Sequence, residues 1–260
     1  MKKVYGLILL GVLMMAGCAS NGRTLNTGPT ETVGFGDDPF FDALEEEYAQ
    51  RQVVISDPLE PVNRVMFGFN DVFYFWVAKP VLQTYEHAVP RPARIGIRNF
   101  FDNLATPVRV VNNLLQGKNE QAGREIDRFV TNTTVGVLGF GDPATDRYNL
   151  PPSRENLGRT LSGYGFGDGF YIVWPLLGPS TLRDSVGMAG DAFLNPVRYV
   201  KPIEASIGIS AANGVNKGSF YIGDYEAFKE ASIDPYVAMR TAYVQYRNSE
   251  NQARPMNPED

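Results

Sequence analysis

The sequence has few of the residues on which enzymes and metal sites depend. Its 260 residues include one cysteine, Cys18, and one histidine, His87. A single cysteine excludes a disulfide within the chain, and the Cys and His spacing of a zinc site is missing. A Ser-His-Asp triad would need His87, yet no G-x-S-x-G nucleophile elbow occurs in the sequence. The glycines follow neither the dinucleotide-binding nor the P-loop order. We therefore expect no enzyme, no metal and no nucleotide cofactor.

Positive charge is also in short supply. The chain has 24 Lys and Arg residues against 29 Asp and Glu residues, a formal net charge of −5. Without Lys2 and Lys3, which lie in a segment that we expect to be removed, the balance is 22 against 29, or −7. Because an acidic protein repels the phosphate backbone, we expect no nucleic-acid partner.

Long hydrophobic runs are missing too. The apolar stretch 4–15 is too short to span a bilayer with ease, and no later segment approaches the roughly 18 continuous apolar residues of a transmembrane helix. Two lysines precede this stretch and Met15-Ala16-Gly17-Cys18 follows it, which indicates a signal peptide. The ending resembles the bacterial lipobox, in which residues 1–17 are removed and Cys18 is acylated. The alternative is an ordinary signal peptide followed by a free thiol.

A lipid on Cys18 would decide where the protein body lies. Each buried methylene contributes about 0.8 kcal/mol, so a diacyl or triacyl anchor holds the protein on its membrane. Ala19 and Ser20 follow the cysteine, whereas in enteric-type bacteria an Asp at that place retains lipoproteins in the inner membrane. We expect the outer membrane, with the body on its periplasmic face, lying on or in one leaflet.

The rest of the chain divides into three predicted segments. Residues 18–56, rich first in Gly, Asn and Thr and then in acidic residues, predict a lipid-anchored flexible tether. Residues 57–247 predict a helical domain, and residues 248–260 a polar C-terminal tail. No alternating strand pattern and no internal repeat is convincing. The predicted fold class is all-α, one domain of about six to eight helices.

Proline and capping residues set the predicted helix boundaries. Pro61 opens a helix over 62–78 that Pro80 ends. Other helices are expected over 92–101, from a cap at Thr106 to Gly117, over 119–138, from a capping box of Thr181 with Asp184 to Phe193, over 203–216, and from a cap at Asp234-Pro235 over 236–247.

The first of these helices is apolar on nearly every side. Such a helix needs apolar surroundings all round, in a deep core or at a lipid surface. The acyl anchor adds weight to the lipid surface, because aromatic-rich helices that lie in a leaflet have this composition. On that interpretation Phe69, Phe73 and Trp76 face the bilayer.

A second unusual stretch alternates glycines with aromatic and acidic residues. Gly163, Gly165, Gly167 and Gly169 punctuate it, and such a pattern does not make a good helix. We expect an irregular segment that approaches other backbone closely. At membrane depth, irregular backbone persists only where protein covers it or where it lines a wet cavity.

Three arginines fall on one face of the helix that Pro92 is expected to open, the first of them just before the proline. Arg91, Arg94 and Arg98 are spaced i, i+3 and i+7. Because a guanidinium binds phosphate bidentately, this basic stripe could attract phospholipid headgroups. The alternative is a solvated face whose arginines pair with carboxylates.

Several motifs, taken in order, resemble the VacJ/MlaA lipoprotein family over residues 57–247. They are DPLEPVNR at 57–64, PRPARIG at 90–96, NNLLQG at 112–117, ENLGRTL at 155–161 with the glycine run after it, WPLLGPSTLRD at 174–184 and DPY at 234–236. The chain departs from the family at Phe170, where a proline is usual, and in its shorter tail.

The resemblance implies a ring of helices embedded in the inner leaflet of the outer membrane, with a central amphipathic channel. It implies that the protein removes mislocalised phospholipids from the outer leaflet and passes them to a periplasmic lipid carrier, with a trimeric porin as partner. The candidates for the channel wall or its support are Asn156, Arg159, Gly163, Gly165, Gly167, Gly169, Arg183 and Asp184. Arg183 and Asp184 could instead form a capping and salt-bridge pair.

Two other functions remain as alternatives. A structural or porin-associated envelope scaffold would move no lipid. A lipid-cleaving enzyme would need a nucleophile beside His87, and the sequence offers no convincing one. Apart from the acyl lipid on Cys18, no cofactor is expected.

Overall fold

A computed structural model describes residues 55–252, which belong to one compact unit, Gln50–Asp260. The predicted signal peptide, the predicted acylation site Cys18, nearly all of the predicted tether and most of the predicted tail lie outside the described residues. Predictions about those segments stay predictions.

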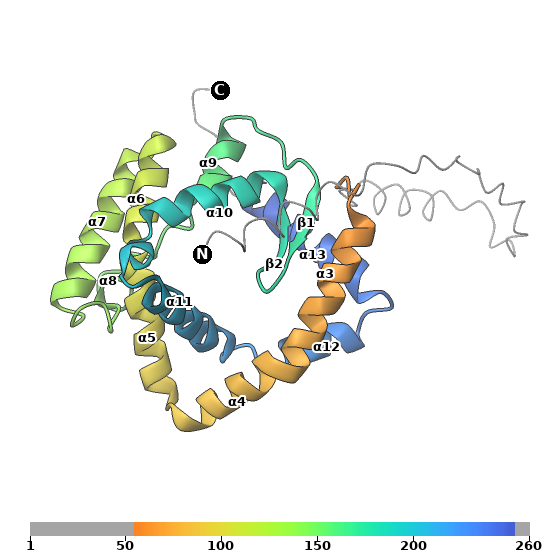
Figure 1. The fold of residues 1–260 in the computed structure, drawn as a ribbon. Coiled ribbons are helices and arrows are strands. Elements are labelled where there is room, and N and C mark those ends of the chain that lie inside the picture. The colour runs from red at the N-terminus through yellow and green to blue at the C-terminus, as the bar shows by residue number, and fades with distance from the viewer. Residues whose placement is uncertain (1–54, 253–260) are drawn as a thin grey trace, which may run out of the picture. The chain divides into compact units, whose positions relative to one another are not determined.

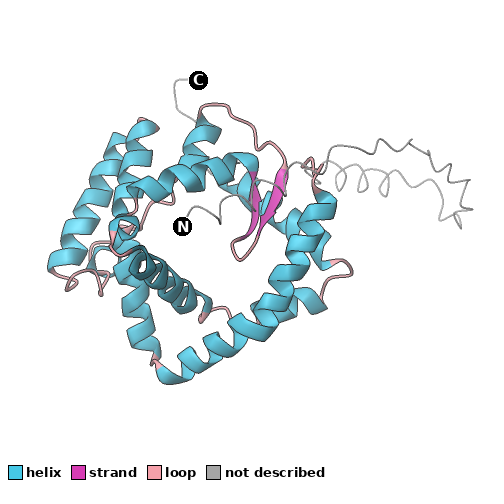
Figure 2. Cartoon of the chain, in the orientation of Figure 1, coloured by secondary structure: helices cyan, strands magenta, loops and turns pink. Residues whose placement is uncertain are grey.

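The all-α prediction is confirmed, since the described residues are mostly helical with one small two-stranded sheet (Figure 2). In chain order the elements are α3 (Glu60–Phe73), η1 (Tyr74–Ala78, a π-helix), α4 (Lys79–Ala88), α5 (Arg91–Leu104), α6 (Thr106–Leu115), α7 (Asn119–Thr134), α8 (Pro143–Asp146), α9 (Leu157–Gly163), β1 (Tyr171–Trp174), β2 (Gly178–Thr181), α10 (Leu182–Leu194), η2 (Pro196–Tyr199, a 3₁₀-helix), α11 (Ile203–Gly218), α12 (Asp224–Glu230) and α13 (Pro235–Gln252).

The prediction that Pro80 ends the first helix is wrong. Helix α3 continues through η1 into α4, and Pro80 lies in the first turn of α4. One π-helical turn at the junction admits the proline, because it alters the backbone hydrogen bonding just where a proline lacks its N–H. The result is a single helical course from Glu60 to Ala88.

Two of the three predicted helix caps are confirmed and one is wrong. The Thr181 side chain accepts a hydrogen bond from the backbone N–H of Asp184 at the start of α10, and Asp234 does the same for Val237 in α13. The predicted cap at Thr106 is wrong, because its hydroxyl donates to the Asn103 carbonyl oxygen and Ala105 occupies the cap position. Helix α7 ends at Thr134 rather than Leu138, since Leu138 itself lies in the left-handed region at φ 57°.

The hairpin of β1 and β2 was not predicted. The strands are antiparallel, with Tyr171 opposite Thr181 and Trp174 opposite Gly178. Two amide side chains of α3 bind its backbone: Asn63 donates to the Tyr171 carbonyl oxygen at 3.0 Å, and Asn70 donates to that of Trp174 at 2.9 Å. The sheet thus depends on a helix more than 100 residues earlier in the chain, which no local pattern reveals.

Within this unit, the ribbon follows a ring-like course (Figure 1). Helices α3, α4, α5, α6 and α10 succeed one another around it, and contact between β1 and α3 closes the circuit. Helix α11 packs against α4 and α5, and α13 packs against β2. Helices from opposite ends of the described range, α3 and α13, therefore both contact the hairpin.

Burial is inverted relative to an ordinary water-soluble protein. Among the described residues other than glycine and proline, eight buried ones are apolar and twenty are polar or charged. Thirty-three large apolar residues are exposed, from Leu59 to Tyr246. Within residues 55–252, the apolar core cluster is small and centres on Tyr171, Val173 and Tyr236. Since soluble folds bury apolar side chains and expose charged ones, this surface suits an apolar medium.

Candidate functional site

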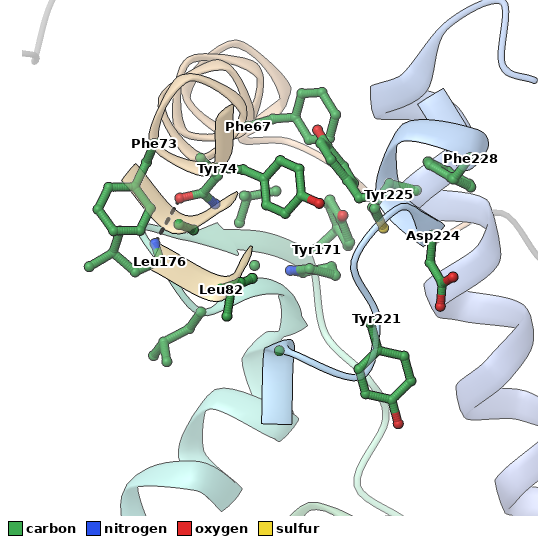
Figure 3. Close-up of a pocket in the computed structure, with 18 residues that line it drawn as sticks. Phe67, Phe73, Tyr74, Leu82, Tyr171, Leu176, Tyr221, Asp224, Tyr225 and Phe228 are labelled. Atoms are coloured by element: carbon green, nitrogen blue, oxygen red, sulfur yellow. Dashed lines mark hydrogen bonds between the residues drawn. The ribbon is translucent and has the colours of Figure 1, made fainter. Parts of the chain in front are cut away.

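A cavity of about 540 Å³ lies between the α3–η1–α4 helical course, the hairpin and the C-terminal helices (Figure 3). Its wall is mainly apolar and aromatic: Phe67 and Phe73 from α3, Leu82 from α4, Val173 from β1, and Tyr225 and Phe228 from α12. The volume falls within the range of about 300–1,000 Å³ that small-molecule pockets occupy. A ligand with apolar groups would suit such a lining, and we take this cavity as the candidate site.

Polar clamps hold α12 against the first helical course. Lys229 bridges to Asp71 at 2.8 Å, and the Tyr225 hydroxyl donates to the same carboxylate at 2.9 Å. Lys79 bridges to Glu226 at 2.7 Å, and the Tyr74 hydroxyl also donates to Glu226. Burial, with the hydrogen bond to Glu226, raises the pKa of Tyr74 to about 12. The cavity wall is therefore fixed by charged groups placed behind it.

The asparagines of α3 fix the other wall. Besides donating to the hairpin, Asn63 accepts from the Val173 backbone N–H at 2.8 Å and Asn70 from that of Leu176 at 2.7 Å. Each amide thus makes a two-way pair with the backbone, as a neighbouring strand would. Sequence reasoning missed this role, and its only local signal was two asparagines, seven residues apart, in an apolar helix.

The predicted channel residues with charge lie elsewhere, in a buried charge ladder. Its members alternate in sign and are Lys118, Glu155, Arg159, Glu250, Arg247, Asp184, Arg183 and Asp168. Neighbouring members are separated by 2.5–3.6 Å. The ladder links α9, α10 and α13 to the glycine segment, because Arg183 bridges to Asp168 and donates to the Phe166 carbonyl oxygen.

The surroundings of one ladder carboxylate, Glu155, favour its ionised form. Burial alone would raise the pKa of Glu155, but hydrogen bonds from Lys118 and Gln116 hold it below its usual value of 4.5. Burial and the bond to Asp184 raise the pKa of Tyr243, which donates to that carboxylate at 2.6 Å. The structure thus brings Arg159, Arg183 and Asp184 together in one network of ion pairs. Asn156, at the start of α9, accepts from the Arg159 backbone N–H.

The glycine segment is irregular, as predicted, although the structure separates its glycines by environment. Gly163 is the last residue of α9, and Gly165 and Gly169 take left-handed backbone at φ 86° and 72°. A Cβ at Gly169 would lie 2.9 Å from the Leu182 Cβ, whereas Gly165 and Gly167 have open space around them. Of the four, Gly169 makes the close approach that was expected. None of them lines the cavity.

The arginine stripe is split by the fold. Arg94 is buried, and its guanidinium contacts Glu86 at 3.0 Å and the Ser219 carbonyl oxygen at 3.0 Å. Arg98 lies 5.0 Å from the centre of the Phe220 ring, and Arg91 is exposed. Any attraction of phosphate groups by this stripe rests on Arg91 and Arg98.

The three residues predicted to face the bilayer have two different environments. Phe69 and Trp76 are 49% and 80% exposed. Phe73 stacks on Phe69 at 6.4 Å and lines the cavity instead. Because Asn63 is the one buried residue of α3 and η1 has none, the deep-core alternative for this helix is wrong.

Within the described residues, neither a metal centre nor a bilayer-crossing helix is present. No cluster of three or more potential His, Cys, Asp or Glu ligands occurs in residues 55–252. No helix of that part is long and apolar enough to cross a membrane. His87 lies in the last turn of α4, with its Nδ1 2.6 Å from the Gln83 carbonyl oxygen.

Comparison with known proteins identifies the family. Residues 55–250 match the profile of the MlaA lipoprotein family. The intermembrane phospholipid transport system lipoproteins MlaA of Shigella flexneri and Escherichia coli K12 are 34% and 33% identical to the chain, each over 94% of it and 87% of the relative. A solved structure, described as the structural basis for maintenance of bacterial outer membrane lipid asymmetry, superposes with a TM-score of 0.66 at 34% identity, covering 75% of this chain and 98% of the other. The chain belongs to the MlaA lipoprotein family.

Proposed function

We propose that this protein is the lipoprotein of an intermembrane phospholipid transport system and maintains lipid asymmetry in an outer membrane. Its relatives are named as lipoproteins of such a transport system, which supports the first part of the proposal. The description of the similar structure supports the role in lipid asymmetry. The observation that carries the proposal is the inverted burial, with polar groups inside, apolar groups outside and an apolar cavity between the helices. Those features suit a protein that handles lipid within a membrane leaflet.

The ring lies in the inner leaflet of the outer membrane, anchored by an acyl lipid on Cys18. The exposed apolar side chains of α3, η1 and α7, such as Val65, Trp76 and Val130, would contact acyl chains. In water they would be a large unfavourable surface, since each costs free energy in proportion to its apolar area. Placing the ring within a membrane leaflet thus explains why apolar side chains are exposed and polar ones are buried.

The route for a phospholipid follows the inside of the ring. Moving a charged headgroup through hydrocarbon costs many kcal/mol by desolvation, and a polar-lined passage lowers this cost. The acyl chains would lie against apolar walls such as those of the cavity. In this role the protein extracts phospholipid from the outer leaflet and delivers it to a periplasmic carrier, with a trimeric porin beside it and without catalysis or another cofactor.

Deletion of the gene tests the proposal. Outer-leaflet phosphatidylethanolamine is labelled on intact cells with an amine reagent that does not cross the membrane. We expect the labelled phospholipid to rise on deletion, to fall when the wild-type gene is restored, and to stay high with Cys18→Ala, which cannot be acylated. An unchanged level on deletion would contradict the proposal and favour a structural scaffold.

A further inference from the structure

The described residues that line the cavity include a single carboxylic acid. Asp224 is the first residue of α12, and its side chain is exposed at the edge of the cavity. No ion pair joins its carboxylate to a cation within residues 55–252. The rest of the lining consists of apolar side chains and neutral polar ones such as Asn70 and Tyr74, so this carboxylate has the strongest preference for a charged ligand.

The charges nearest to Asp224 cancel one another. Glu226 is paired with Lys79 at 2.7 Å, and Asp71 is paired with Lys229 at 2.8 Å. These two pairs are neutral overall, so one uncompensated negative charge remains at this edge of the cavity. Such a site attracts a cationic group and repels a phosphate or carboxylate.

Aromatic rings gather on the same side. In Figure 3, Asp224 and Tyr221 lie on the side of the cavity that Tyr225 and Phe228 form, away from Phe73 and Leu176. The rings of Tyr225 and Tyr74 meet edge to face at 4.8 Å. The negative faces of aromatic rings attract ammonium ions, most strongly where water is partly excluded.

Beside the cavity, the protein places two ammonium groups over the ring of Phe75, a residue that does not itself line the cavity. Lys229 and Lys79 lie 5.0 and 5.7 Å from the centre of the Phe75 ring. Phe75 in turn contacts Tyr225, with ring centres 6.2 Å apart. Ammonium groups that contact both a carboxylate and an aromatic ring thus already occur next to this edge of the cavity.

We infer that the Asp224 side of the cavity binds the ammonium group of a zwitterionic phospholipid, while an acyl chain occupies the apolar side between α3 and the hairpin. This inference rests on the proposed function and adds a headgroup preference to it. Lipids with a net negative headgroup and no ammonium are disfavoured, because their charge meets the carboxylate of Asp224.

Asp224 also lies in the first turn of α12, where a carboxylate stabilises the helix dipole by about 0.3–1 kcal/mol at an exposed site. A purely structural role would change stability and leave lipid preference alone. The variant Asp224→Asn keeps the size of the side chain and removes its charge, and Glu230→Gln removes an exposed carboxylate at the other end of α12 that does not line the cavity.

The experiment measures bound lipid by mass spectrometry. Full-length protein is reconstituted in vesicles of equal phosphatidylethanolamine and phosphatidylglycerol, re-extracted in mild detergent and analysed for the ratio of the two lipids. We expect the wild-type protein and Glu230→Gln to enrich phosphatidylethanolamine. Loss of one charge–ammonium contact at a partly exposed site should lower this enrichment about threefold to tenfold in Asp224→Asn. Asp224→Lys should favour phosphatidylglycerol.

Two results would overturn the inference. Wild-type protein that binds both lipids at the vesicle ratio has no headgroup preference, and Asp224→Asn with undiminished enrichment assigns the preference to other residues. Both leave the proposed function standing. Wild-type protein that retains no phospholipid at all would contradict the proposed function and the headgroup preference together.

Discussion

Two walls of the same ring are built in opposite ways. The α3–η1–α4 wall is apolar toward the outside, where Trp76 is exposed, and apolar toward the cavity, where Phe73 lies. The α9–α10–α13 wall has the charge ladder in its interior. The first wall is held by polar contacts at its edges and the second by charges within it. The comparison teaches that an interior without a large apolar core can still be specified, because complementary charges fix its geometry.

The largest difference between the walls should appear on removing one carboxylate from each. Asp184→Leu leaves Arg247 and Arg183 buried without this partner, and breaking a buried pair costs about 3–5 kcal/mol. Asp71→Leu breaks a bridge to Lys229, which is 37% exposed, and should cost about 1 kcal/mol or less. Thermal unfolding in mild detergent, followed by circular dichroism, measures both. Equal losses of stability in the two variants would contradict the difference between the two walls.

A single charge introduced on the outer face of the α3–η1–α4 wall tests whether that face contacts lipid. Trp76→Lys places a charge at a site that is 80% exposed, which would be nearly neutral for a surface in water. In hydrocarbon the same charge costs about 2.5–3.5 kcal/mol, so the non-acylated protein should partition less into liposomes. Thr241→Lys, on the exposed face of α13, serves as the control and should partition as wild type does. Identical partitioning of both variants would place Trp76 outside the bilayer.

Close backbone packing within the α9–α10–α13 wall can be compared with the open surroundings of a glycine in α11. A Cβ at Gly187 in α10 would lie 2.4 Å from the backbone nitrogen of Gly158 in α9. Gly187→Ala should therefore destabilise the protein by about 1–3 kcal/mol through overpacking. At Gly208 in α11 the Cβ meets open space, and Gly208→Ala should stabilise by up to about 1 kcal/mol. Unfolding temperatures of the two variants should move in opposite directions; a shared direction contradicts the packing.

The smallest expected effect is a dependence of stability on pH. The pKa of Glu155 is lower in the folded protein than its usual value of 4.5, so the unfolded chain binds the proton more readily. This contribution is fully present above pH 4.5 and is lost as the pH falls through the lowered pKa. Glu155→Gln should flatten the decline in unfolding temperature below that pH. A decline as steep as in the wild type would assign the effect to other carboxyl groups.

Local patterns in the sequence predicted much of the fold. The Thr181 and Asp234 caps begin α10 and α13 as expected, since capping depends on residues two or three positions apart. The short elements α8, α9, η2 and α12 were not predicted. They hold too few residues for hydrophobic periodicity to mark them.

Long-range pairing explains what the sequence did not predict about the site. Arg159, Arg183 and Asp184 were singled out individually, but their partners Glu250 and Arg247 lie more than 60 residues away. The cavity needs α3, the hairpin and α12 at once, and Asp224 has no local sequence signal. Composition did indicate the unusual surface, because a helix that is apolar on all sides required apolar surroundings.

The central claim is that phospholipid passes along the cavity, and one matched pair of variants tests it most directly. Ala78 lines the cavity, whereas its neighbour Val77 is exposed and does not line it. Ala78→Trp fills the cavity with the residue that Val77→Trp places on the outer surface. In cells lacking the wild-type gene, outer-leaflet phosphatidylethanolamine is labelled for each variant. We predict that Val77→Trp restores the low wild-type level and Ala78→Trp leaves it as high as deletion does. Full restoration by a folded, acylated Ala78→Trp protein would contradict passage through this cavity.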